Sequence, residues 1–100
     1  MINIFEGEEP TAGTELLDEL YHDQRITINR IQSNQLEDGV WYDQEEDEWL
    51  VLLDGEALLE FESKQHPLKK GDTLFIPAHQ PHRVKKTSAT ALWLTLHLPL

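Results

Sequence analysis

From Arg25 onward, apolar residues occur in short runs that are separated by turn-forming residues. Several runs are rich in β-branched residues or alternate with polar ones, which is typical of β-strands. Many short strands with frequent turns predict an all-β fold, a sandwich or barrel of antiparallel strands over residues 25–98. The runs lie at residues 25–31, 49–53, 57–61, 73–76, 82–85 and 92–98.

Residues 1–22 have a different pattern and predict an N-terminal arm with a short helix. Apolar residues recur here at helical spacing, and Thr14 before them is a suitable N-cap. We therefore expect a helix or helical turn ahead of the barrel. Its apolar residues are Leu16, Leu17, Leu20 and Tyr21.

The dipeptide Asp54-Gly55 lies between two apolar runs and is a preferred sequence for a two-residue type I′ hairpin. Such a turn would pair residues 48–53 with residues 56–61 and set directly opposed residues on one face. One of the two faces is apolar and is expected to form the interior. Glu48 has the same parity, so its carboxylate is expected to point inward as well. The apolar face comprises Leu50, Leu52, Ala57, Leu59 and Phe61.

Basic and non-basic residues alternate in the strand that begins at His82. Arg83 and Lys85 share one face, which is the more easily solvated of the two. His82 and Val84 are then expected to point inward. Glu48 and His82 are therefore predicted to converge from two strands on one interior.

Composition bounds the size and the partners of the protein. A chain of 100 residues, of which 39% are hydrophobic, is expected to form one domain over residues 1–100. A domain of this size has a thin stability margin, which favours a homodimer, and Val51 and Leu58 are candidates for its interface. The net charge of −11 disfavours binding to nucleic acid and to anionic membranes.

Cysteine is absent, which excludes disulfides, thiolate metal sites and a cysteine nucleophile. The chain begins without a recognisable secretory signal, and its apolar runs are too short to span a bilayer. We therefore expect a cytoplasmic protein whose partner is a small molecule.

Two motifs lie on either side of the Asp54-Gly55 turn. In the first, six residues separate Glu48 from Gly55, and in the second, five residues separate Gly71 from Pro77, with His82 following. These spacings, within residues 39–86, resemble the two motifs of the cupin superfamily, and the surrounding sequence is similar to small single-domain bacterial cupins. The resemblance implies an antiparallel double-stranded β-helix, or jelly-roll barrel, with a pocket at one end.

The resemblance also implies a divalent metal, which cupins usually bind through three histidines and a glutamate. His82 and Glu48 occupy two of these four positions. With four intervening residues before Glu48, Asp43 stands at the second histidine and Trp41 at the first. Because an indole cannot be a ligand, the expected ligands are His82, Glu48 and Asp43. One nitrogen and two carboxylates would suit Mn, Fe, Zn or Ni.

His79 and Gln44 are additional candidate ligands. His79 replaces a glycine of the motif and would add a nitrogen if its turn folds inward, or else it is a surface turn residue. Asp43 lies in an acidic run and either faces the pocket or is solvated with its neighbours. Glu48 and His82 could also pair without a metal and exchange protons.

His97 has two open roles. It is either a hydrogen-bonded structural histidine or a pocket residue, the latter if the face that it shares with Trp93 forms the interior. The other residues expected to line the pocket are Trp41, Leu50, Leu59, Phe61 and Val84.

Three classes of function follow. The first is a metal-binding barrel with a small polar ligand or substrate, and in an enzyme the metal would act as a Lewis acid or an O₂ site. The second is a metal-free module that binds or senses a small molecule. The third is a structural protein with a vestigial site. No substrate is named by the sequence, because one barrel architecture serves many unrelated chemistries.

Overall fold

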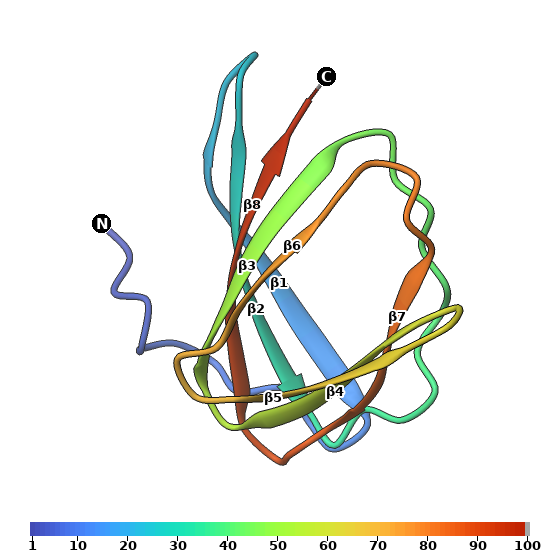
Figure 1. Ribbon diagram of the computed structural model, residues 1–100. Coiled ribbons are helices and arrows are strands. Elements are labelled where there is room, and N and C mark those ends of the chain that lie inside the picture. The colour runs from blue at the N-terminus through green and yellow to red at the C-terminus, as the bar shows by residue number, and fades with distance from the viewer. Residues whose placement is uncertain (100) are drawn as a thin grey trace.

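The computed structural model describes residues 1–99, and all of the regular elements in that range are β-strands (Figure 1). None of the elements in residues 1–99 is a helix long and apolar enough to cross a membrane. The strands are β1 (Thr14–His22), β2 (Thr27–Asn34), β3 (Asp47–Asp54), β4 (Glu56–Phe61), β5 (Gln65–Lys69), β6 (Thr73–Ile76), β7 (His82–Thr87) and β8 (Ala91–Leu98).

The strands form two antiparallel sheets that face each other across a shared interior (Figure 1). The larger sheet has the order β1-β2-β8-β3-β6, and the smaller has the order β5-β4-β7. Two packed sheets with these crossing connections make a jelly roll. The predicted all-β, antiparallel fold is therefore confirmed.

The predicted N-terminal helix is wrong. Residues 14–22 form the strand β1, which pairs with β2 from Thr14↔Asn34 to His22↔Thr27. A spacing of i, i+1, i+4 and i+5 is compatible with a helix. Pairing with the whole length of a neighbouring strand outweighs this local preference, because it forms backbone hydrogen bonds at every second residue. β1 lies at the edge of its sheet, and Leu17 on it is 61% exposed.

The predicted hairpin at Asp54-Gly55 is also wrong, because β3 and β4 belong to different sheets. β3 pairs with β6 and β8, whereas β4 pairs with β5 and β7. The dipeptide is instead the corner at which the chain passes from one sheet to the other. Gly55 has φ +86°, and a Cβ there would collide with the carbonyl oxygen of Thr90 and the hydroxyl of Ser88.

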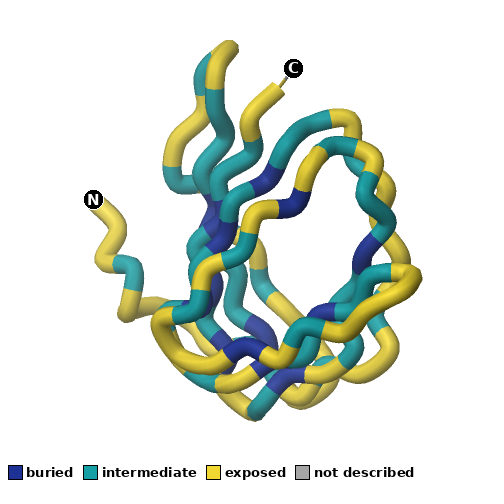
Figure 2. The backbone as a smooth tube through the Cα atoms, viewed as in Figure 1, coloured by how far each residue is buried: buried dark blue, intermediate teal, exposed yellow. Residues whose placement is uncertain are grey.

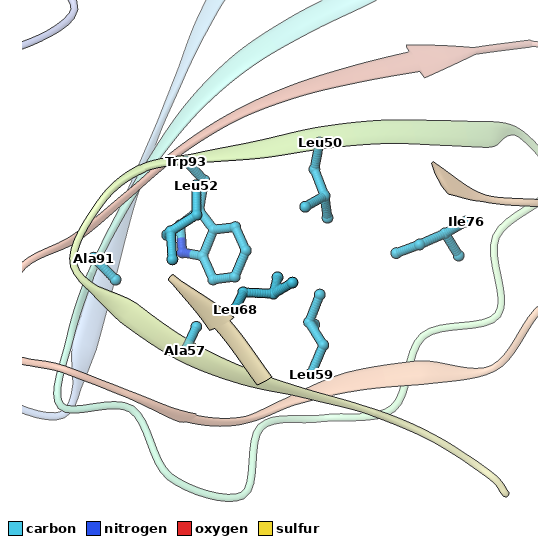
Figure 3. Close-up of a cluster of buried hydrophobic side chains, with 8 residues drawn as sticks. All are labelled: Leu50, Leu52, Ala57, Leu59, Leu68, Ile76, Ala91 and Trp93. Atoms are coloured by element: carbon cyan, nitrogen blue, oxygen red, sulfur yellow. The ribbon is translucent and has the colours of Figure 1, made fainter. Parts of the chain in front are cut away.

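The core lies between the sheets, and Figure 3 shows its side chains pointing toward one another from both. Four of the five residues predicted for the interior are buried, and Phe61 at the end of β4 is only partly buried. These residues point inward although the predicted pairing was wrong, because side chains alternate between the two faces in the strands on both sides of the corner. The buried apolar residues are Leu50, Leu52, Ala57, Leu59, Leu68, Ile76, Ala91 and Trp93.

Residues 1–10 run across the outside of the larger sheet and are mostly exposed (Figure 2). Arg30 on β2 attaches this segment, because its guanidinium donates hydrogen bonds to the carbonyl oxygens of Asn3 and Glu6. The same guanidinium donates two hydrogen bonds to Asp18, at 3.0 and 2.6 Å. Arg30 is buried, and these oxygens supply the partners that a buried cation requires.

Candidate functional site

A cavity of about 180 Å³ lies between the two sheets. Its walls are largely apolar, and its polar groups gather where β3, β7 and β8 approach one another. It is smaller than the cavities of roughly 300–1,000 Å³ that hold drug-sized ligands, so its occupant must be small. The lining residues are Glu15, Leu17, Ile31, Tyr42, Gln44, Glu48, Leu50, Leu59, Ile76, His82, Val84, Trp93, Thr95 and His97.

Glu48 is at the centre of the polar part and is only 6% exposed. It lies on β3 between two paired strands, opposite Ile76 of β6 and His97 of β8. His82 reaches it from β7 in the other sheet. The His82 Nε2 atom lies 3.7 Å from Glu48 Oε1, and the His97 Nε2 atom lies 4.0 Å from Glu48 Oε2.

The orientation of the His82 ring is fixed by its backbone surroundings. Its Nδ1 atom lies 2.9 Å from the carbonyl oxygen of Gln80. A carbonyl only accepts hydrogen bonds, so Nδ1 carries the proton in the neutral ring and Nε2 presents a lone pair toward Glu48. Two backbone hydrogen bonds between Tyr42 and His82, at 2.8 and 3.0 Å, hold the start of β7 in place.

His97 has a similar arrangement at the other carboxylate oxygen of Glu48. Its Nδ1 atom lies 3.2 Å from Glu46 Oε1, which is an ion-pair distance, although the two groups are not aligned for a hydrogen bond. Its Nε2 atom lies 3.4 Å from the hydroxyl of Thr95. Two imidazole Nε2 atoms therefore face one buried carboxylate from two sheets.

Burial raises the pKa of the Glu48 carboxyl to about 7, with a further increase from the nearby Glu46 and a decrease from a hydrogen bond with Gln44. Burial also lowers the pKa of His97, and the nearby Glu46 opposes this shift. Near neutral pH, Glu48 thus exchanges between its acid and its carboxylate form. A group poised in this way can transfer a proton or bind a cation.

The side chains around Glu48 have the atom types that bind divalent ions, and their nitrogens point toward its carboxylate. The distances between these atoms are too long for all of them to hold one ion. As they stand, no three His, Asp or Glu side chains within residues 1–99 lie close enough together to hold an ion. Two ligands of one ion, each about 2.1 Å from it, lie roughly 3.0–3.4 Å apart. The gaps of 3.7 and 4.0 Å around Glu48 are somewhat wider than this. The buried Oε1 of Gln44, which has no hydrogen-bond partner, is a further oxygen that could act as a ligand.

Comparison with known proteins agrees with this architecture. The family model of the cupin domain matches residues 30–97. The chain belongs to the cupin family. No curated protein matches this cupin.

Solved structures share the fold over nearly the whole chain. The "putative mannose-6-phosphate isomerase" from Ralstonia eutropha JMP134 is 32% identical, with a TM-score of 0.88, and the match covers 100% of this cupin and 98% of that chain. A cupin superfamily protein from Desulfitobacterium hafniense DCB-2 is 23% identical, with a TM-score of 0.78, over 93% of this cupin and 84% of that chain. KdgF from Halomonas sp. is 18% identical, with a TM-score of 0.82, over 99% and 93%. The last two similarities show the fold alone.

The structure separates two of the expected ligands of this cupin from the cavity. Asp43 and His79 are paired with each other on the surface, with His79 Nδ1 2.8 Å from Asp43 Oδ1. Their side chains are 59% and 65% exposed, and neither lines the cavity. The count with four residues before Glu48 therefore gave residues whose side chains face outward.

With three intervening residues before Glu48 in place of four, the same count gives Gln44 and Tyr42, and both line the cavity. Gln44 was considered from the sequence, but Tyr42 was missed as a site residue. The alternative count and the shared parity with Glu48 were the signals that could have found it.

The expected lining residues divide in the same way. Leu50, Leu59, Val84 and His97 line the cavity, whereas Trp41 and Phe61 do not. The Trp41 ring lies outside, with the Arg83 guanidinium carbon 5.0 Å from its centroid. The Phe61 ring lies beside the His66 ring, 4.6 Å between centroids, and 6.4 Å from the His82 ring.

Other lining residues were missed for an identifiable reason. Glu15 and Leu17 lie on β1, which the sequence pattern predicted to be a helix. Trp93 and Thr95 lie on the same face of β8 as His97, a face whose direction the sequence left open. Its assignment requires the pairing of β8 with β2 and β3, which residue patterns do not encode.

Proposed function

We propose that this cupin binds a divalent metal ion in its cavity through Glu48 and His82. The observation that carries the proposal is the approach of the His82 Nε2 lone pair to a buried carboxylate, 3.7 Å away. When Glu48 is ionised, its carboxylate and the imidazole lone pair gain from a shared cation, and a buried carboxylate needs such a partner. When bound, the ion would supply Lewis-acid polarisation to a ligand.

The lining of the cavity restricts the ligand that such a site would take. Glu15 and Glu48 are the charged acidic groups in the wall, and no Lys or Arg of the described residues lines it. A phosphate group would meet these carboxyl groups and find no Lys or Arg, so that the bound ion would have to hold it alone. The sugar phosphate in the name of the Ralstonia protein is therefore not carried over to this cupin. A small, uncharged or cationic molecule with one polar end fits better.

A metal-free acid–base site is a second candidate. It is favoured by the pKa of Glu48 near 7 and by the distances between Glu48, His82 and His97, which are too long for the three to hold one ion. In this case Glu48 and His82 would move a proton to or from a ligand held against the apolar wall.

The two candidates are separated by measuring metal binding directly. We expect untagged protein, purified without chelator, to contain metal by elemental analysis. The stripped protein should bind one Mn²⁺, Fe²⁺, Zn²⁺ or Ni²⁺ per chain by calorimetry. Glu48→Gln and His82→Gln should each weaken binding by at least about 100-fold, because each removes a direct ligand.

Asp43→Asn is the matched control, because it changes a carboxylate of the same segment that lies outside the cavity. It should leave the affinity unchanged. Protein with less than about 0.1 metal per chain and no thermal shift on adding any of these ions would contradict the metal site. The acid–base candidate would then stand.

A further inference from the structure

We propose that His97 is the third ligand of this metal site and that Glu46 positions it. The inference rests on the proposed function and goes further, because β8 lies outside the two motifs that resemble those of cupins. Neither of the two first-motif positions where cupins usually have histidines carries an imidazole in this chain. Tyr42 and Gln44 are the residues of that segment that line the cavity.

The strand register brings His97 to the site. His97 and Glu48 are directly paired between β8 and β3, and directly paired residues point to the same side of a sheet. Both therefore face the cavity, and their Nε2 and Oε2 atoms are 4.0 Å apart. A side chain held by two long paired strands is more rigid than one on a loop, which suits a ligand.

The surroundings of His97 resemble those of a metal ligand. Its side chain is 13% exposed, and its Nδ1 atom lies 3.2 Å from the Glu46 carboxylate, within ion-pair distance although not aligned for a hydrogen bond. Metal-binding histidines usually direct their second ring nitrogen to a carboxylate or a carbonyl oxygen, which fixes the ring and makes the ligating nitrogen more basic. The Glu46 side chain is 40% exposed. Glu46 would act through His97 and would not touch the ion.

His82 completes the arrangement from the opposite sheet. Its Nδ1 atom faces the carbonyl oxygen of Gln80, as that of His97 faces Glu46. Two neutral imidazoles and one carboxylate form a donor set that suits Mn²⁺, Fe²⁺, Zn²⁺ or Ni²⁺ and leaves positions open for a ligand. The buried Oε1 of Gln44 is available as a fourth donor.

The experiment uses Co²⁺ as a spectroscopic probe of the stripped, untagged protein. We expect one Co²⁺ per chain, with visible absorption bands that report the ligand set. His97→Gln should weaken Co²⁺ binding by at least about 100-fold and shift the bands, because a nitrogen ligand is lost. Glu46→Gln should weaken binding by about tenfold and shift the bands less, as expected for a residue that positions a ligand.

His79→Gln is the control, since this exposed histidine lies outside the cavity. It should leave both affinity and bands unchanged. Far-UV circular dichroism and the melting temperature of each stripped variant show whether it is folded. If His97→Gln does not fold, His97→Asn and the Glu46→Gln bands provide the test.

The outcomes separate the two proposals. If wild-type protein binds no Co²⁺, Zn²⁺, Mn²⁺ or Ni²⁺, the proposed function fails and this inference fails with it. If wild-type protein binds the ion, His82→Gln abolishes binding and His97→Gln keeps the wild-type affinity and bands, the inference about His97 alone is overturned.

Discussion

The burial of Glu48 lowers the stability of the fold, and the same burial suits the carboxyl to the chemistry of the site. Its carboxyl is enclosed by two sheets and has a pKa raised to about 7 by burial. Ionising it in this position is unfavourable unless a cation or a proton is close. Stability and site chemistry are therefore linked through one titration.

The titration predicts how stability depends on pH. The pKa of Glu48 rises from its ordinary value of 4.5 to about 7 on folding, so its burial costs nothing below pH 4.5. The cost grows as pH rises and is complete above pH 7. The shift corresponds to about 3 kcal/mol. In chelator, the stability of Glu48→Gln relative to wild type should rise by about this amount between pH 4.5 and pH 8.

Urea unfolding of both proteins across this pH range measures the difference. Asp43→Asn is the control, because it removes an exposed carboxylate of the same segment that lies outside the cavity. Parallel curves for wild type and Glu48→Gln would show that Glu48 ionises normally in the fold.

Residue parity predicted part of the site and missed the rest for a physical reason. Alternation alone turned Glu48 and His82 inward, and the structure has both in the cavity wall. In the segment before β3, the choice between Asp43 and Gln44 depends on the isolated bridge between Tyr42 and His82. That contact is long-range, so nothing local in the sequence decides which of the two residues faces inward.

At the scale of elements, local signals located turns and strands but not their partners. Asp54-Gly55 separates two strands as predicted, but it forms a corner between sheets instead of the predicted hairpin, because a hairpin turn and a corner share the same local signal. The choice was made by the pairing of β3 with β8 and of β4 with β7. The same holds for β1, where pairing with β2 outweighed a helical spacing.

The corner makes a quantitative prediction for Gly55. Gly55→Ala should destabilise the protein by about 3 kcal/mol or more, because a left-handed backbone is combined with a collision against Thr90 and Ser88. Gly71→Ala is the matched control, since Gly71 also has a positive φ, +92°, but nothing lies within 4 Å of its added Cβ. It should cost only about 1 kcal/mol.

Urea unfolding at one pH compares the two variants. The difference between them isolates the crowding at the corner from the backbone term that both share. Equal losses would mean that the segment around Thr90 relaxes freely around a side chain.

At the scale of the whole molecule, the expected homodimer stays a prediction. β1 ends the larger sheet, and Leu17 on it is 61% exposed, which leaves an unpaired strand edge with an exposed apolar side chain. The net charge of −11 opposes association of two copies. We therefore expect sedimentation to show a dimer that becomes stronger as salt is added.

Leu17→Lys should shift this equilibrium toward the monomer, because a charge on an edge strand disfavours pairing. Phe75→Lys is the control, since Phe75 is 51% exposed on β6 at the opposite end of the same sheet. A monomer at high protein concentration and at every salt concentration would contradict the dimer.

Glu48 and His97 belong to one sheet and His82 to the other. A cation held by all three would fasten the two layers of the sandwich together, as a disulfide does in secreted domains. This chain has no cysteine, so the fastening would be reversible and set by metal supply and acidity. The occupied protein would then open its layers less often, and backbone amides of β3, β7 and β8 would exchange their hydrogens together and more slowly.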